Sequence, residues 1–410
     1  MKRIVSSEQA SGAVMSSADE MRLSDAFRRL KAPETGRTVV QLTDGEGFTY
    51  PLYFYIPTIT GDGKYLIHHR AAACEIQLYR LELATGRSTR LTRAACPDTQ
   101  WRPWCVDSGR GVLDHRSVLN VARGLVVYFD GARVRSVDVE TLEDKLLFTI
   151  PEDREPYGQN CCTPDGQWFV YIHTPRGAIW GKPCSGAAVV AYHFDTKQQR
   201  TLCRVDSAVF HVTAFDNEHF VVTHPADHGG MLWTDLTSGR IVPLRDDDPG
   251  VRGHLIHSQV TSRGIIYEVP DAGLLGIYDP LKRRRFEFQW PEGFQYIHTG
   301  RDPEGRLWFH ENSSAWDRFD VHDMHALLRL DPKGDHEWIR LTGSWPTYGG
   351  GQKAHFHPQL TPDRKWILFT GGDPRAQTNH LFLLDVSDLG DTQGIGPNLL
   401  STTGAYDLVP

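Results

Sequence analysis

Long apolar segments are missing from this sequence, although 40% of its 410 residues are hydrophobic. No run reaches the about 18 consecutive apolar residues that a membrane-spanning helix needs. The opening segment, MKRIVSSEQASGAVMSSADEM, contains basic residues but no continuous apolar stretch, so we expect no signal peptide. These absences predict a cytoplasmic protein without a membrane partner.

Cysteines paired as C-x-x-C and a net positive charge are also missing. The seven cysteines are an odd number and form no C-x-x-C pair, which indicates reduced thiols rather than a disulfide framework. The net charge of −7 provides no basic field for a nucleic acid. An anionic ligand would therefore need a local cluster of binding groups. Whether the protein is a monomer or a homodimer stays open.

Several catalytic motifs and most helical periodicity are absent as well. The sequence contains no G-x-S-x-G, P-loop, G-x-G-x-x-G or H-E-x-x-H motif, so serine hydrolase, nucleotide and zincin chemistry have no support. Helical periodicity is confined to MRLSDAFRRL at residues 21–30, where we expect a short helix. The remaining segments are short, rich in β-branched and aromatic residues, and separated by Gly, Pro and Asp turns.

These short segments repeat. Each copy has an alternating strand, a turn of the T-P-D-G type and a second strand, often followed by a third strand and a D-x-x-T-G turn. Seven copies begin 41 to 59 residues apart, at Thr58, Ser117, Asn160, His211, His257, His298 and His357. The pattern predicts an all-β fold, a seven-bladed β-propeller spanning residues 38–410 as a single domain. Residues 1–37 would form an N-terminal extension containing the short helix.

The two ends of the repeat array predict how the propeller closes. The last copy has three clear strands, the third at residues 381–386, and no convincing fourth. An isolated strand, TVVQLT at residues 38–43, precedes the first copy. We expect this strand to pair into the last blade and cover its exposed edge. Two unrelated β domains are the alternative, which the absence of a linker disfavours.

Histidines recur in one register of these repeats. Four blades carry a histidine four residues before the turn motif, namely His211, His257, His298 and His357. Equivalent positions of different blades lie on one ring around the channel, so these side chains should converge at one end of it. Polar residues that only hold water in the channel are the alternative.

The segment GGGQKAHFHPQLTPD adds metal-ligand chemistry to this ring. It places Gln352, His355 and His357 within six residues, and in an extended segment the two imidazoles share a face. With His298 from the preceding blade they offer three imidazoles and an amide oxygen, which suit Mn, Fe, Ni or Zn rather than Ca. Neutral ligands leave such an ion its full charge for polarising a carboxylate or carbonyl. His257, one blade earlier, is a candidate general base.

The segment QKAHFHPQLTPDRKWILFT and the seven-blade layout resemble the oligogalacturonate lyases, intracellular propeller lyases of pectin degradation. LYFYIPTITGDGKYLI, at residues 52–67, is similar to the first blade of that family. The resemblance runs through most of the chain in blade order and is weakest in the middle blades. It implies that Gln352, His355, His357 and His298 hold a manganese ion. It also implies that His257 removes the C5 proton of a uronic acid in a β-elimination, while the metal neutralises the uronate carboxylate.

One position departs from the family. The family carries a functional arginine in the segment that corresponds to THPADHGGMLW at residues 223–233, and Gly230 stands in its place. Candidates for its role are Arg176 in a long insertion of blade three, His224 and His228 in the same segment, and Arg252 ahead of His257. His211 in the ring is a further candidate for substrate binding.

This departure leaves other substrates and functions open. The rivals are a lyase or glycoside hydrolase for glucuronate-linked units such as rhamnosyl-glucuronate, and a non-catalytic TolB-like propeller that binds protein partners. A hydrolase would want two carboxylates across the glycosidic bond, whereas the ring positions are histidines. The four histidines that share one position of the repeats, and the missing signal peptide, disfavour a TolB-like propeller.

Overall fold

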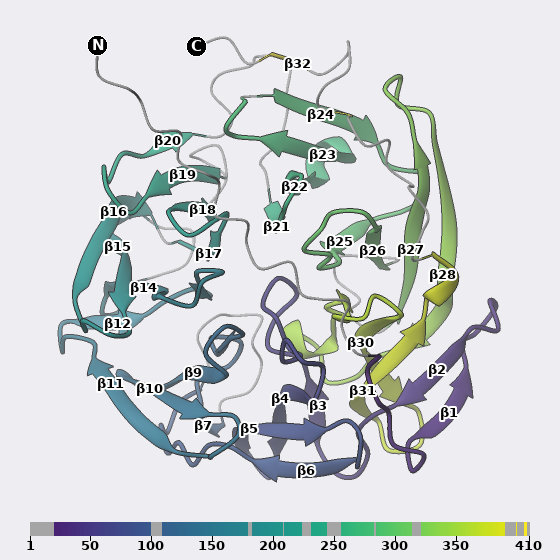
Figure 1. Cartoon of the computed structure of the whole chain (residues 1–410), viewed down its shortest axis with the longest axis horizontal. Helices are drawn as coiled ribbons and strands as arrows, with labels where there is room; N and C mark the ends of the chain where they lie inside the picture. The colour runs from purple at the N-terminus through teal and green to yellow at the C-terminus, as the bar shows by residue number, and fades with distance from the viewer. Residues whose placement is uncertain are drawn as a thin grey trace, which may run out of the picture.

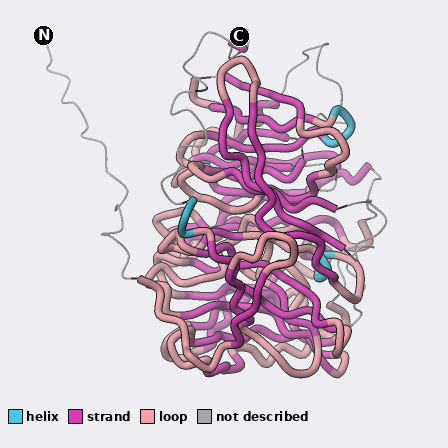
Figure 2. Tube along the Cα trace, turned by 90° about the vertical axis from the view of Figure 1, so that its right-hand side faces the viewer, coloured by secondary structure: helices cyan, strands magenta, loops and turns pink. Residues whose placement is uncertain are grey.

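The described strands form seven largely antiparallel sheets arranged around a common centre (Figure 1). The computed structural model describes residues 20–99, 109–178, 183–207, 209–223, 231–243, 256–282, 284–313, 321–389, 399 and 406–407. The predicted all-β, seven-bladed propeller is therefore confirmed. Helical structure in this part of the chain is limited to short 3-10 segments, as Figure 2 shows from the side. No helix of the described residues is long and apolar enough to cross a membrane.

The first three blades follow the predicted repeats. Blade one contains β3 (Phe48–Tyr50), β4 (Tyr65–Ala72), β5 (Glu75–Glu82), β6 (Arg87–Arg90) and β7 (Arg110–Gly111). Blade two contains β8 (Val118–Asn120), β9 (Leu125–Asp130), β10 (Arg133–Asp138) and β11 (Asp144–Thr149). Blade three contains β12 (Arg154–Pro156), β13 (Cys161–Cys162), β14 (Trp168–Pro175), β15 (Pro183–His193) and β16 (Gln199–Ser207).

The other four blades complete the ring. Blade four contains β17 (His211–Ala214), β18 (His219–Thr223), β19 (Met231–Asp235) and β20 (Val242–Pro243). Blade five contains β21 (Ile256–Thr261), β22 (Gly264–Val269), β23 (Leu274–Asp279), β24 (Arg284–Gln289) and β32 (Tyr406–Asp407). Blade six contains β25 (Tyr296–Thr299), β26 (Trp308–Ser313), β27 (Val321–Leu330) and β28 (His336–Pro346). Blade seven contains β29 (Gln359–Leu360), β30 (Trp366–Asp373), β31 (Thr378–Asp385), β2 (Thr38–Gln41) and β1 (Arg28–Lys31).

Blade seven is built from both ends of the described chain. β2 pairs antiparallel with β31, with Val40 opposite Leu383. The helix predicted over residues 21–30 is wrong, because residues 28–31 form β1, which pairs with β2. A ten-residue helix has little stability of its own. The free edge of β2 instead supplies backbone hydrogen-bond partners, which favours one more strand.

Neighbouring blades pack through alternating side chains of their strands. On β30, Phe369 joins a buried cluster that includes Phe309 of blade six. The preceding residue, Leu368, joins another cluster that includes Leu66 of blade one. Successive side chains of a strand point to opposite faces, so each blade is fixed by both of its neighbours. This packing gives the channel-lining strands a rigid frame.

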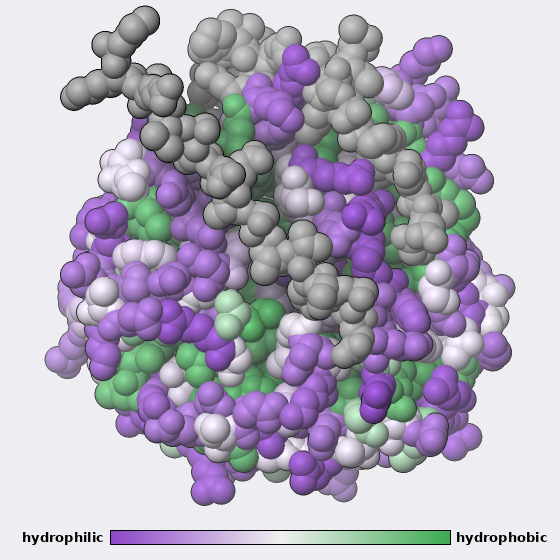
Figure 3. Space-filling model, in the orientation of Figure 1, coloured by the Kyte–Doolittle hydropathy of each residue, from purple (hydrophilic) through white to green (hydrophobic). Residues whose placement is uncertain are grey.

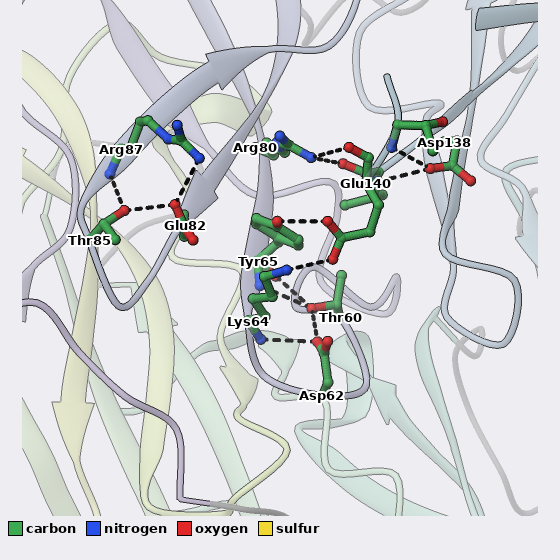
Figure 4. Close-up of polar contacts among 12 residues, drawn as sticks. Thr60, Asp62, Lys64, Tyr65, Arg80, Glu82, Thr85, Arg87, Asp138 and Glu140 are labelled. Carbon is green, nitrogen blue, oxygen red and sulfur yellow. Dashed lines mark hydrogen bonds and ion pairs between the residues drawn. The ribbon is translucent and has the colours of Figure 1, made fainter. Parts of the chain in front are cut away.

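A polar network joins the turn of blade one to blade two (Figure 4). Glu140 accepts hydrogen bonds from Lys64 Nζ at 2.7 Å and from Tyr65 Oη at 2.9 Å. Arg80 donates to the backbone oxygen of Glu140 at 3.1 Å. The hydrogen bond to Glu140 raises the pKa of Lys64. Because Lys64 and Glu140 are largely exposed, this contact positions the turn more than it stabilises the fold. Hydrophilic side chains also cover much of the described surface on the face shown in Figure 3.

Candidate metal centre and base

The structure brings four of the predicted site histidines together. The ring centroid of His298 lies 4.6 Å from that of His257, 4.6 Å from that of His357 and 4.7 Å from that of His355. These residues lie in the chain segments at which blades five, six and seven begin. Three of the four are at most 2% exposed. The cluster therefore lies inside the protein, where its contacts are fixed by the surrounding strands.

Local backbone geometry aims these side chains. His257 and His357 have φ angles of 49° and 45°, in the left-handed region that non-glycine residues seldom adopt. At His257 the register of β21 against β22 shifts between Ile256 and Gln259, which is a bulge that re-aims a side chain. Each such conformation costs about 1–3 kcal/mol, and residues of this kind concentrate at functional sites.

The Gln-x-x-His-x-His segment is not a strand as a whole. Gln352 opens the 3-10 segment η3 (Gln352–Ala354), and β29 begins only at Gln359. His355 and His357 nevertheless point the same way, with their rings stacked at 5.7 Å, while Phe356 between them is buried in the core. Gln352 Oε1 lies 3.0 Å from His357 Nε2. The motif thus gathers its donor atoms on one side, as expected.

A buried carboxylate, Glu311, orients two of the imidazoles. Its Oε2 lies 2.9 Å from His298 Nδ1, and its Oε1 lies 2.9 Å from His355 Nδ1. An ionised carboxylate only accepts hydrogen bonds, so both Nδ1 atoms carry hydrogen and both Nε2 atoms keep a lone pair. Metal-binding histidines are commonly held in this way by a carboxylate. Among the described residues, the buried His298 Nε2 has no hydrogen-bond partner, as expected for a nitrogen that binds a metal.

Charge and burial keep these groups in metal-binding form. Burial lowers the pKa of His298 to about 3, so its imidazole is neutral near pH 7. Burial alone would raise the pKa of Glu311, but its electrostatic interactions with the His355 and His322 imidazoles, and the hydrogen bond from His298, hold that pKa well below its usual range. A metal needs neutral imidazoles as ligands. The donor set of three imidazoles and an amide oxygen therefore fits a divalent transition-metal ion.

His257 has its own buried carboxylate. Glu268 Oε2 lies 2.7 Å from His257 Nδ1, and Glu268 Oε1 accepts a hydrogen bond from Thr299 Oγ1 at 3.1 Å. Burial alone would raise the pKa of Glu268, but its electrostatic interaction and hydrogen bond with the His257 imidazole bring that pKa down to about 2. Glu268 is thus ionised and holds the Nδ1 hydrogen of His257. The Nε2 atom of His257 remains available to accept a proton.

Glu268 and Glu311 were not identified from the sequence. Each lies on the second strand of its blade, in the stretches GIIYEV and WFHENS, whose residues are all buried. Glu311 is the direct cross-strand partner of His298. A lone carboxylate in a buried strand is the signal that marks both residues, although it does not tell which histidine each one contacts.

An aromatic segment between β3 and β4 fills the channel beside the histidines; we call residues 53–55 the channel segment. The connection that contains it extends toward the middle of the ring (Figure 1). The Phe54 ring lies 4.7 Å from that of His298, and the Tyr53 ring lies 4.9 Å from that of His357. No pattern in the sequence indicated this role. The channel segment contributes a wall of the site.

The predicted substrate-binding residues lie in different places. His211 is 8% exposed, and its Nε2 lies 3.4 Å from Tyr53 Oη, so it contacts the channel segment. Arg176 is exposed in the loop after β14, where its Nε donates to the Glu152 oxygen at 3.1 Å. The roles of these two residues in substrate binding stay predictions. His224, His228, Gly230 and Arg252 lie outside the described residues.

The buried neutral histidines predict a pH-dependent stability. Burial lowers the pKa of His298 to about 3 and that of His68 to about 4, compared with 6.5 for an exposed imidazole. Between these values the unfolded chain binds protons that the folded chain does not, so stability is complete above pH 6.5 and falls as the pH drops toward 4. Each group contributes about 1.4 kcal/mol per pH unit in that window.

Chemical denaturation of the EDTA-treated protein at several pH values measures how steeply the free energy of unfolding changes with pH. His68→Phe removes one titrating group, so its slope should be lower by about 1.4 kcal/mol per pH unit. An unfolding free energy that does not change between pH 7 and 4.5 would contradict the prediction.

The sequence of this chain is similar to those of known lyases. No protein-family model matches the chain. It is 24% identical over 381 residues to the oligogalacturonate lyase of Dickeya dadantii, covering 85% of this chain and 94% of that protein. It is also 24% identical over 382 residues to the oligogalacturonide lyase of Pectobacterium atrosepticum, covering 84% and 92%.

Solved structures give the same result. An oligogalacturonate lyase of Vibrio parahaemolyticus matches with a TM-score of 0.71 and 17% identity, covering 88% of this chain and 96% of that one. An oligogalacturonate lyase in complex with manganese matches with a TM-score of 0.71 and 19% identity, covering 89% and 98%. The resemblance of this chain to the oligogalacturonate lyases, indicated by the sequence of its last blade, is thus confirmed over most of its length.

Proposed function

We propose that this chain is a metal-dependent lyase that cleaves oligogalacturonate-like uronic-acid oligosaccharides by β-elimination. The observation that carries the proposal is the juxtaposition of a carboxylate-bound histidine base and a metal-ligand set. The His257 ring lies 4.6 Å from the His298 ring, and Glu268 and Glu311 hold these two histidines separately. Proteins similar to this chain along most of its length are named oligogalacturonate lyases, and one such structure is a manganese complex.

The metal would be held by His298, Gln352, His355 and His357. When bound, a divalent ion such as Mn²⁺ supplies positive charge that neutralises the uronate carboxylate and stabilises the negative charge developing next to C5. Glu311 keeps the Nε2 lone pairs of His298 and His355 available for coordination, as its contacts with both Nδ1 atoms indicate.

His257 would remove the proton from C5 of the uronic acid. Its Nε2 accepts that proton, and Glu268 stabilises the imidazolium that forms. The electrons of the C5–H bond form the C4–C5 double bond, and the C4–O bond to the neighbouring sugar breaks. The departing oxygen takes a proton from solvent. The products are an unsaturated uronate and a shortened oligosaccharide.

A lyase for glucuronate-linked units is the second candidate, because Gly230 stands where the resemblance to the oligogalacturonate lyases implies an arginine. A glycoside hydrolase has less support. It needs two carboxylates at the glycosidic bond, whereas Glu268 and Glu311 are fully buried and bind imidazole nitrogens. A protein-binding propeller would not need a buried base beside a metal-ligand set.

Metal removal tests the proposal. The purified protein is treated with EDTA, dialysed with or without Mn²⁺, and incubated with oligogalacturonates and with glucuronate-linked oligosaccharides. We expect the ultraviolet absorbance of the unsaturated product to rise only when metal is present. No rise on any uronate with metal supplied would exclude the lyase. A rise on the glucuronate-linked substrates alone would favour the second candidate.

A further inference from the structure

A second group of metal-ligand side chains lies where blade one meets blade two. His69 is on β4, and Asp114 and His115 precede β8. Each offers one ligand atom, and these atoms all lie within 4.8 Å of one another. Both histidines are 0% exposed and Asp114 is 4% exposed. Polar groups that converge away from water carry a desolvation cost unless something binds them together.

Backbone carbonyl groups fix the tautomers of both imidazoles. His69 Nδ1 lies 3.2 Å from the Pro51 oxygen. His115 Nδ1 lies 3.3 Å from the Leu52 oxygen. A carbonyl oxygen only accepts, so both Nδ1 atoms carry hydrogen, and in the neutral rings both Nε2 atoms have a lone pair. Among the described residues, the buried His69 Nε2 has no hydrogen-bond partner.

The carboxylate and both rings are also held by a shared neighbour. Tyr50 Oη donates to Asp114 Oδ1 at 2.8 Å. The Tyr50 ring stacks on the His69 ring at 5.0 Å and contacts the His115 ring at 4.9 Å. Metal sites are commonly supported by such neighbours, which orient the ligands before the ion binds. His115 Nε2 lies 3.7 Å from Asp114 Oδ1, so the electron-rich atoms face one another.

We propose that His69, Asp114 and His115 bind a second divalent transition-metal ion. Two imidazole nitrogens and a carboxylate oxygen suit Mn, Fe or Zn. Two donors of one ion are at most about 4.2 Å apart, twice a bond of about 2.1 Å. The three ligand atoms already lie within 4.8 Å of one another, so small side-chain movements suffice to bind an ion. The carboxylate also distinguishes this site from the first one, whose candidate ligands are all neutral.

The second site is adjacent to the first but shares no ligand with it. The rings of His115 and His357 lie 5.5 Å apart. Pro51 and Leu52, which hold the two imidazoles, directly precede the channel segment. An ion here would therefore fix the start of the segment that packs against His298 and His357. It would also join blade one to blade two near the channel.

Metal stoichiometry tests the inference without any activity assay. The full-length protein is stripped with EDTA and brought to equilibrium by dialysis against Mn²⁺ or, separately, Zn²⁺, and the bound metal is measured by mass spectrometry. We expect two ions per chain in the wild type and one in His69→Phe, whose phenyl ring can still stack on Tyr50. His355→Ala should also bind one ion, and the double variant of His69 and His355 almost none.

His68→Phe is the matched control. His68 is the neighbouring buried histidine, and its ring stacks instead on Tyr79 at 5.9 Å. This variant should keep two ions. Asp114→Asn tests the same site if circular dichroism shows that His69→Phe does not fold. One ion per chain in the wild type, kept by His69→Phe or Asp114→Asn, would overturn the inference. That result would point to a proton shared within the group, and lyase activity could still be present.

Discussion

Replacing His257 with alanine is expected to lower kcat for uronate elimination by about 10²–10⁴-fold, the usual contribution of a positioned general base. His257 Nδ1 binds Glu268, and its Nε2 is the atom left to take the C5 proton. It is not one of the four proposed metal ligands, so the protein should still bind one Mn²⁺ at the first site. Steady-state kinetics on oligogalacturonates and a metal measurement on the same sample give both quantities.

Glu268→Gln is the companion variant, because it keeps the shape of the side chain but changes its hydrogen bonding. A glutamine amide can donate to His257 Nδ1, and this places the ring hydrogen on Nε2, where it blocks proton abstraction. We expect kcat to fall while KM and metal content stay near the wild-type values. If His257→Ala keeps kcat within tenfold of the wild type, another residue is the base.

The seven blades could be predicted because each carries its own local signal. A turn motif followed by a strand recurs in every copy, and its recurrence requires no knowledge of contacts between distant residues. The segment at residues 28–31 shows the limit of this approach. Its sequence has helical periodicity, but the unpaired edge of β2 decides its structure, and that edge exists only in the closed propeller.

The histidines of the site could be predicted for the same reason, whereas their carboxylates could not. Glu311 reaches His298 because β25 and β26 pair in one particular register. Glu268 reaches His257 across a bulge that shifts the register of β21 and β22. Neither register can be read from spacing alone. His211 occupies the equivalent position of blade four, but it is not one of the four histidines that meet around His298, and its Nε2 lies 3.4 Å from Tyr53 Oη of the channel segment.

Glu311→Gln is expected to weaken Mn²⁺ binding at the first site by at least about 10–100-fold, the usual effect of losing a residue that orients a ligand. Glu311 accepts hydrogen bonds from two candidate ligands, His298 and His355, through different oxygens. A glutamine keeps one acceptor oxygen, and its NH₂ group cannot accept from the second ring. That ring then favours the tautomer with hydrogen on Nε2, which cannot bind a metal. The substitution also removes a negative charge beside the ion.

Calorimetric titration of Mn²⁺ into the stripped protein measures the affinity. Glu268→Gln is a matched control, since it removes an equally buried carboxylate that binds His257 instead of a ligand. The two variants should therefore distinguish a defect in metal binding from a defect in the base. Glu311→Gln should lose affinity and recover activity as Mn²⁺ is raised, whereas Glu268→Gln should bind Mn²⁺ normally and stay slow at any concentration. Wild-type affinity in Glu311→Gln would mean that His298 and His355 do not need this carboxylate to present their Nε2 atoms.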